Sequence, residues 1–350
     1  MTSPVDGLQC PLPLGTRTTV LLGHGSGGRM TAELLTRFFL PAFANPALDQ
    51  LNDQAVLDVH GLRLALTTDA FVVAPLFFPG GDIGSLAVNG TVNDLAMCGA
   101  TPLALSAAFI LEEGLPLADL QRVIASMADA CRATGVHLVT GDTKVVERGK
   151  GDGLFITTSG IGLVTHPLTI SADRAQPGDC LLVSGPIGDH GIAVLSAREG
   201  LEFETTLVSD TAPLHTLVQA LIAGSPDIHC LRDPTRGGLA TTLNELATSS
   251  RVGMRLEEDH LPIRDEVRAA CELLGLDPLY VACEGRLVAI VGEKDAAAVL
   301  ARMHAHPLGA EARLIGRVVA EHPGRVTLRT GLGSERIVDM LSGAQLPRIC

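Results

Sequence analysis

Apolar positions recur along this chain in two alternating patterns, one typical of helices and one typical of strands. Apolar side chains keep helical spacing through residues 28–40, and the pattern stops at Pro41. Residues 85–98 predict a helix of small side chains with Ser85 as its N-cap. The same patterns predict helices at 117–131, 189–199, 213–223, 237–249 and 264–274, and strands at 62–68, 136–140, 154–164, 180–185, 286–292 and 326–330.

This alternation predicts an α+β chain of two domains, because 350 residues exceed one average domain. Residues 172–179 (ADRAQPGD) are polar and contain Pro and Gly, which favours a boundary there. We therefore expect a mobile leader at 1–20, an N-terminal domain at 21–171, a C-terminal domain at 172–332 and a mobile tail at 333–350.

Composition excludes several classes of function. A net charge of −13 without a basic run disfavours nucleic acid as a partner. No stretch reaches the roughly 18 apolar residues of a membrane span. Eight scattered cysteines without CxxC pairs are typical of reduced thiols, and the N-terminus lacks the features of a signal peptide. We expect a cytoplasmic protein that binds neither membrane nor nucleic acid.

Two glycine-rich segments precede predicted helices and suit phosphate groups. The first contains Gly25, Ser26, Gly27 and Gly28, whose backbone N–H groups can approach an anion. It matches neither a Walker A motif nor a dinucleotide fingerprint, so a flexible glycine turn explains it equally well. The second, RDPTRGG at 232–238, places Asp233, Arg236 and Gly237 at a helix N-terminus. Its alternative is an ordinary Pro/Gly turn with an Asp cap.

Aspartates follow several predicted elements of the N-terminal domain. Asp53, Asp69, Asp94 and Asp142 each lie beside a strand or a small-residue helix. One such aspartate would usually be a cap or a turn residue. Four in one domain favour a magnesium and phosphate site, because Mg²⁺ prefers carboxylate oxygens together with substrate phosphates.

Amides and ionisable groups extend this candidate site. Asn89 and Asn93 share one face of an apolar helix, which favours side chains directed into a site. Thr143 and Lys144 follow Asp142 in a predicted turn at 141–143, where Lys144 could hold phosphate or transfer a proton. A solvated lysine is the simpler alternative. Glu284 lies in an apolar strand context, where an unpaired carboxylate is rare.

Cys350 is the last residue, so it cannot be a prenylated CaaX cysteine, which needs three residues after it. A tail of about 15 residues reaches up to ~50 Å when extended. It could therefore enter the active site of its own chain and also present the thiol to another protein.

Together these motifs resemble the HypE family of hydrogenase maturation factors, within the superfamily of aminoimidazole ribonucleotide synthetase and selenophosphate synthetase. The likeness covers residues 21–350. It is carried, in the family's order, by HGSGG, NDQAVL, TTDAF, VNGTVNDLAMCGA, GDTKVVERG, RDPTRGG, CEGRL and the terminal PRIC. The resemblance implies an aminoimidazole ribonucleotide synthetase-like fold, whose N-terminal domain closes a β-barrel-like core with a second copy in a homodimer and binds ATP near that interface.

The resemblance also implies the reaction. A carbamoyl group arrives on Cys350 from the carbamoyltransferase HypF, and ATP with Mg²⁺ drives its dehydration to a thiocyanate. The cyanide then passes to the HypC–HypD complex for a nickel–iron hydrogenase. Lys144 and Glu284 are the implied proton acceptors. The implied nucleotide contacts are the two glycine segments, Asn89, Asn93, Thr143 and the four aspartates, which also hold the metal.

Three other hypotheses fit the sequence less well. Selenophosphate synthetase needs a reactive Cys or selenocysteine followed by a Lys in the early glycine loop, and GHGSGGR has neither. Aminoimidazole ribonucleotide synthetase gives no reason for a terminal PRIC. A non-catalytic scaffold or metallochaperone lacks paired Cys/His spacing.

Overall fold

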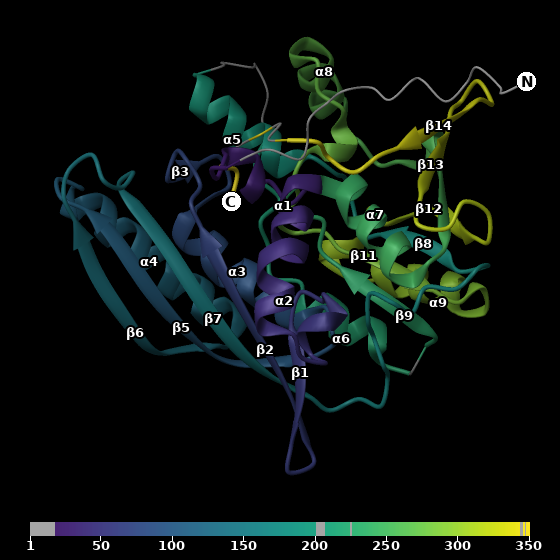
Figure 1. Cartoon of the computed structure of the whole chain (residues 1–350), viewed down its shortest axis with the longest axis horizontal. Coiled ribbons are helices and arrows are strands. Elements are labelled where there is room, and N and C mark those ends of the chain that lie inside the picture. Colours follow the sequence, from purple (N-terminus) through teal and green to yellow (C-terminus); the bar gives the residue numbers. More distant parts are fainter. Residues whose placement is uncertain (1–17, 201–206, 225, 344–345, 347) are drawn as a thin grey trace, which may run out of the picture.

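The computed structural model describes residues 18–200, 207–224, 226–343, 346 and 348–350, and two sheets organise them (Figure 1). The first sheet has five strands in the order β1-β2-β7-β5-β6. β5 and β6 are parallel and the other neighbours are antiparallel. The strands are β1 (Ala55–Val59), β2 (Leu62–Phe71), β5 (Thr101–Glu112), β6 (His137–Val146) and β7 (Leu154–Val164).

Two helices cover one face of this sheet (Figure 1). α3 (Ile83–Ala96) is buried on almost every side, which its small side chains permit, and α4 (Leu117–Thr134) packs against it. The N-cap of α3 is Asp82, whose carboxylate accepts from the backbone N–H of Gly84 and Ser85. Ser85 was predicted as the cap and instead closes a capping box from the third helical position.

The other face of the first sheet carries exposed apolar side chains. Strand register places alternate residues on opposite faces, and the outward residues include Leu66, Ile110 and Ile161, all at least 36% exposed. β6 is an edge strand that is exposed along nearly its whole length. A monomeric soluble protein rarely leaves such a surface uncovered.

The second sheet has seven strands in the order β14-β13-β10-β12-β8-β11-β9. Its strands are β8 (Cys180–Val183), β9 (Ile228–Arg232), β10 (Gly253–Glu257), β11 (Val288–Val291), β12 (Arg313–Val319), β13 (Val326–Arg329) and β14 (Glu335–Val338). Its helices are α5 (Asp189–Glu199), α6 (His215–Ile222), α7 (Gly238–Ser250), α8 (Asp265–Leu274) and α9 (Glu293–His304). One apolar cluster, which includes residues of α7, packs on this sheet. A second cluster includes residues of α6 and α9.

The N-terminal helical segment continues past the proline that was expected to end it. α1 (Arg29–Leu34) runs through a π-helical turn at Leu35–Phe39 into α2 (Leu40–Phe43). Pro41 lies in the first turn of α2, where its missing N–H is not required. A short hairpin, β3 (Phe77–Phe78) and β4 (Gly81–Asp82), leads into α3.

The predicted helices and strands of both domains are confirmed, with two further differences. The predicted turn at 141–143 lies inside β6, because Ala107 and Ala108 of β5 pair with these residues and continue the strand. Glu335–Val338, within the expected tail, form β14. Residues 1–17 of the expected leader lie outside the described residues. Across the described parts, none of the helices combines the length and apolar character that crossing a bilayer requires.

Candidate active site

The C-terminal thiol lies inside the molecule, next to the end of β2. The backbone N–H of Val72 donates to a terminal carboxylate oxygen of Cys350 at 2.9 Å, and Cys350 is 5% exposed. A guanidinium nitrogen of Arg236 lies 3.4 Å from its Sγ. Burial raises the pKa of the Cys350 thiol to about 12, although the charge of Arg236 opposes this shift. The docked sulfur is therefore a protonated thiol until it is modified or moves out.

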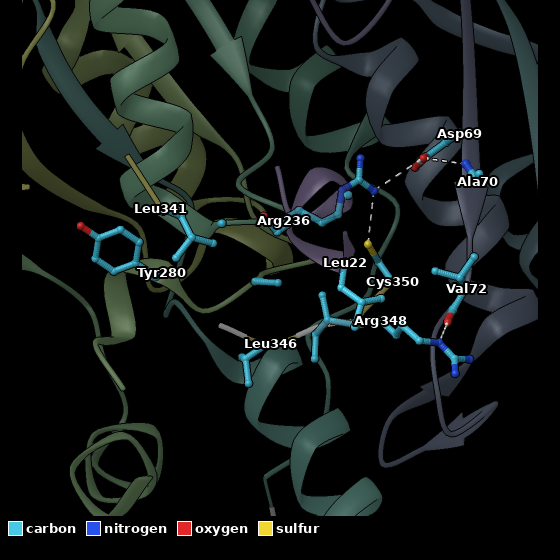
Figure 2. Close-up of a pocket in the computed structure, with 15 residues that line it drawn as sticks. Leu22, Asp69, Ala70, Val72, Arg236, Tyr280, Leu341, Leu346, Arg348 and Cys350 are labelled. Atoms are coloured by element: carbon cyan, nitrogen blue, oxygen red, sulfur yellow. Dashed lines mark hydrogen bonds and ion pairs between the residues drawn. The ribbon is translucent and has the colours of Figure 1, made fainter. Parts of the chain in front are cut away.

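A cavity of about 340 Å³ opens beside the sulfur (Figure 2). Arg236 reaches into it between Cys350 and Asp69, 3.9 Å from the nearer Asp69 oxygen. The cavity brings together residues from both predicted phosphate-binding segments and from the tail. These are Gly25 and Ser26, Arg236 and Gly237, and Arg348, Ile349 and Cys350.

The first glycine segment packs closely against its neighbours. Gly27 has φ +78°, and a Cβ there would meet the Arg236 carbonyl oxygen at 2.7 Å. A Cβ on Gly28 would overlap the backbone of Leu341. These two glycines therefore allow the loop to lie against the arginine loop and the tail. Neither of them lines the cavity, whereas Gly25 and Ser26 do.

Three carboxylates gather next to this cavity. Ligand oxygens of Asp53, Asp94 and Asp233 lie within 4.8 Å of one another. Burial, with the charges of neighbouring carboxylates, raises the pKa of Asp53 to about 6 and of Asp233 to about 8, and it raises that of Asp94 well above its usual range. Asp69 is close enough for its charge to contribute to all three shifts.

The protein itself compensates this negative charge only in part. Arg232 pairs with Asp53 at 2.7 Å, and Thr67 donates to Asp94 at 2.7 Å. Asp233 is 5% exposed, and the charge of Arg232 opposes the rise in its pKa only in part. Three hard oxygen donors with excess negative charge suit a divalent cation such as Mg²⁺. The predicted ligands Asp53, Asp69 and Asp94 therefore lie together, and Asp233 joins them.

Asp142, Thr143 and Lys144 lie in β6, away from the cluster of Asp53, Asp94 and Asp233. Register pairs Asp69 with Thr158 and Asp142 with Ala108, which places Asp142 on the uncovered face of the sheet and Asp69 on the helix-covered face. Lys144 pairs with Asp142 at 2.6 Å and lowers the pKa of that carboxyl. Asp142, predicted as a metal ligand with the other three, does not meet them within one chain, because two strands separate β6 from β2.

The two predicted amides have protein partners. Asn93 is fully buried, donates to the carbonyls of Ala212 and Glu284 at 3.1 and 3.2 Å, and accepts from the Leu214 N–H at 2.7 Å. Asn89 faces Thr211 at 3.4 Å. Asn93 thus joins α3 to the second domain and fixes the backbone of Glu284. The structure gives its amide no spare donor for a nucleotide.

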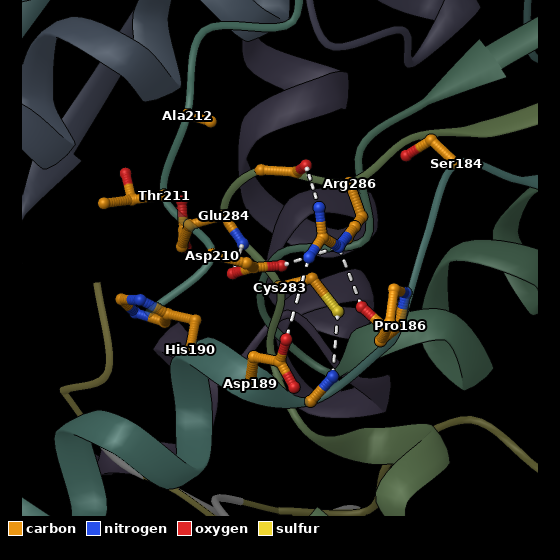
Figure 3. A network of polar contacts seen from close by, with 12 residues as sticks. Ser184, Pro186, Asp189, His190, Asp210, Thr211, Ala212, Cys283, Glu284 and Arg286 are labelled. Atoms are coloured by element: carbon orange, nitrogen blue, oxygen red, sulfur yellow. Dashed lines mark hydrogen bonds and ion pairs between the residues drawn. The ribbon is translucent and has the colours of Figure 1, made fainter. Parts of the chain in front are cut away.

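Glu284 is 2% exposed, and one of its carboxylate oxygens has no hydrogen-bond partner. Burial, with the charges of Asp233 and Asp69, raises its pKa well above the usual range. Its backbone N–H donates to Asp210 at 3.0 Å, which ties it to the buried Asp210–Arg286 contact (Figure 3). Its charge also acts on the Cys350 thiol. This is a carboxyl group suited to take up a proton beside the sulfur.

Several residues of this arrangement were missed in the sequence. Asp233 was predicted as a nucleotide contact and not as a metal ligand, and Arg232 was not singled out. Both belong to RDPTRGG, so the signal was present. Asp210 belongs to no motif, and Arg286 lies in CEGRL without an assigned role. The hydrogen bond from Glu284 to Asp210 and the Asp210–Arg286 contact reveal both.

Comparisons with known proteins identify the family of the chain. Residues 51–164 match the N-terminal domain of AIR synthase related proteins, and residues 176–329 match the C-terminal domain. A relative in Cupriavidus necator, the carbamoyl dehydratase HypE, is 57% identical over 345 residues, 98% of each chain.

Two solved structures are similar throughout. A HypE in complex with ATP is 51% identical with a TM-score of 0.80, covering 95% of this chain and 100% of that one. The HypE of a HypE–HypF complex is 48% identical with a TM-score of 0.84, covering 88% and 99%.

Both matched domains and their ATP-bound relative define the chain as an AIR synthase related protein. Within that class, the identity across nearly the whole length is specific for one branch: the chain belongs to the HypE family of carbamoyl dehydratases. The resemblance stated from the motifs is confirmed.

Proposed function

We propose that this chain is an ATP-dependent carbamoyl dehydratase that converts an S-carbamoyl group on its own Cys350 to a thiocyanate. One observation carries this proposal. The Cys350 sulfur lies in a cavity that also exposes both glycine segments, next to a buried carboxyl group and three clustered aspartates. The covalent substrate, the phosphate-binding groups and a base thus meet at one place.

The residues divide the chemistry between them. An amide oxygen is a poor leaving group, and phosphorylation by ATP makes it a good one. Arg236, which contacts the sulfur and faces Asp69, is positioned to hold the carbamoyl oxygen and the incoming phosphate. Glu284 accepts an N–H proton as the nitrile forms once it is ionised. The charge of Arg236 favours the ionised form, and the raised pKa makes that carboxylate a stronger base than an ordinary glutamate.

Mg²⁺ fits the carboxylate cluster. Asp53, Asp94 and Asp233 would hold the ion, with Asp69 beside them, and it would neutralise negative charge on the triphosphate. Loss of the protons that burial and repulsion retain on these carboxyl groups would accompany its binding.

A homodimer would bring Lys144 to the site. Lys144, Thr143 and Asp142 lie on the edge strand of a sheet whose outer face is apolar and uncovered. A second copy packed on this face would close the β-barrel-like core and direct these residues towards the partner's site. In this arrangement Lys144 pairs with Glu284 of the opposite chain in proton transfer.

The reaction also requires two partner proteins, one to supply the carbamoyl group and one to accept the cyanide. One relative forms a HypE–HypF complex, which supports HypF as the carbamoyl donor. The HypC–HypD complex accepts the cyanide in this proposal. Because docked Cys350 is buried, both transfers require the tail to leave the cavity. The buried, unpaired cysteines among the described residues suit the cytoplasm.

ATP hydrolysis tests the function directly. We expect phosphate release that requires prior carbamoylation of the chain and that is lost in Cys350→Ala, since that variant carries no substrate. The matched control is Cys98→Ala, another buried cysteine remote from the tail, which should retain the activity. Hydrolysis in Cys350→Ala at the wild-type rate would contradict the proposal.

A further inference from the structure

The last three residues lie in a groove between the end of β2, the β6–β7 loop and α5. We call it the tail groove and define it by Val72, Ala74, Asp152, His190 and Arg198. The N–H groups of Val72 and Ala74 donate to the backbone oxygens of Cys350 and Arg348 at 2.9 and 3.3 Å. This spacing is that of an antiparallel strand added beyond the end of β2.

α5 holds the same backbone from the other side. His190 lies 2.8 Å from the Ile349 carbonyl, and Arg198 donates to the Arg348 carbonyl at 2.6 Å. Burial lowers the pKa of His190 to about 4, so its ring is neutral. With Ser209 donating to Nδ1 at 2.8 Å, Nε2 carries the hydrogen that reaches Ile349. A backbone oxygen of each residue of the tripeptide therefore has a partner.

Each side chain of the tripeptide also has a defined environment. The Arg348 guanidinium forms an ion pair with Asp152 and donates to the Val72 carbonyl at 3.1 Å. Ile349 is 3% exposed within the apolar cluster of the first domain. Cys350 meets Arg236. The tail groove thus contacts a charged side chain, an apolar side chain and a thiol at three successive positions.

We propose that the tail groove is a sequence-reading peptide site: it takes an extended C-terminal Arg-Ile-Cys segment, and it accepts that segment from a separate molecule as well as from its own chain. Asp152 is the specificity-determining residue for Arg348, and His190 is a positioning residue for the Ile349 carbonyl. The proposal deepens the proposed function, because docking sets how often carbamoylated Cys350 meets Glu284.

The open space beside the sulfur supports this view. The cavity of about 340 Å³ adjoins Cys350 without being filled by the tail, so a carbamoyl group on the sulfur fits while the backbone contacts persist. Apart from the contact between Arg236 and the sulfur, the contacts that hold the tripeptide lie on its backbone oxygens and on Arg348. Modified and unmodified tails therefore use the same groove.

Alkylation of Cys350 in the full chain, followed by site-resolved mass spectrometry, measures docking without any dehydration. Asp152→Arg and Arg348→Asp should each raise the alkylation rate by roughly three- to tenfold, because each places like charges together. The double variant should recover part of the protection. The matched controls Asp129→Arg and Arg132→Asp reverse an exposed pair on α4 and should change nothing.

A labelled synthetic peptide ending in Leu-Pro-Arg-Ile-Cys tests recognition from a separate molecule. It should bind the Arg348→Asp chain, whose own tail is displaced, more tightly than the wild type, and a peptide with Asp in place of Arg should not bind. Unchanged alkylation in both single variants, or no peptide binding to Arg348→Asp, would overturn the proposal. Protection and peptide binding without dehydration would leave the groove intact and count against the dehydratase instead.

Discussion

Glu284→Gln is expected to stop dehydration of carbamoylated Cys350 while leaving carbamoylation unchanged. Gln keeps the shape of the side chain and removes the proton acceptor. Loss of a positioned general base typically costs about 10²- to 10⁴-fold in rate, and we expect a loss in this range. The measurement is single-turnover phosphate release from the carbamoylated chain with saturating ATP.

Stability should not explain that loss. The raised pKa of Glu284 means that burial already favours the neutral carboxyl group, so a neutral amide costs the folded state little at neutral pH. Thermal unfolding checks this point. Glu293→Gln, which alters an exposed glutamate paired with Arg317, is the matched control and should keep full activity. A rate within a few-fold of wild type in Glu284→Gln would remove Glu284 from the mechanism.

Mixed dimers of two inactive variants should regain activity. In the proposed homodimer, Lys144 of one chain serves the site that contains Glu284 and Cys350 of the other. A Lys144→Ala chain joined to a Glu284→Gln chain therefore forms one intact site and one doubly defective site. Random assembly of co-expressed chains gives about half mixed dimers, so we expect roughly a quarter of wild-type activity.

The matched control for that experiment combines Glu284→Gln with Cys350→Ala. Both residues belong to the same chain's site, and each tethered tail competes with the partner's tail for its own groove, so activity should stay well below that of the first mixed dimer. No recovery with Lys144→Ala would show that Lys144 does not act across an interface. Equal recovery in the control would show that exchange of the tail, and not Lys144, restores the activity.

Local sequence was sufficient for most of the elements, and it singled out segments that the fold brings to one cavity. Periodicity predicted α4 and β7, because amphipathic spacing and a β-rich run are local properties. The glycine segments and Asp53, Asp69 and Asp94 were found because their residue types suit phosphate and metal, and the fold brings them together.

The features that the sequence did not reveal concern residues whose partners come from distant parts of the chain. The turn predicted at Gly141–Thr143 became strand because β5 supplies partners along its whole length. Asn93 was predicted as a nucleotide contact, and nothing in the sequence indicated the partners of its amide at Ala212 and Glu284. Asp142 shares the chemistry of the other aspartates but lies on the opposite face of the sheet. The spacing of these residues along the chain does not determine which of their side chains meet in the fold.

The tail shows the same limit. Its glycines predicted mobility, and the docked position of Arg348 depends on Asp152 and α5, which are far away in sequence. The terminal Cys350 indicated a carrier thiol, whereas the partners that hold it could be identified only from the fold. A tail that alternates between a docked and a released state is consistent with both the predicted mobility and the docked position of Cys350.

Intact-mass analysis of the carbamoylated chain is the most direct test of the central claim. We expect HypF to add a carbamoyl group to Cys350, and we expect that adduct to lose one water when ATP and Mg²⁺ are supplied, with no loss when either is withheld. Retention of the full carbamoyl mass in the presence of ATP and Mg²⁺ would contradict the assignment of this chain as the dehydratase.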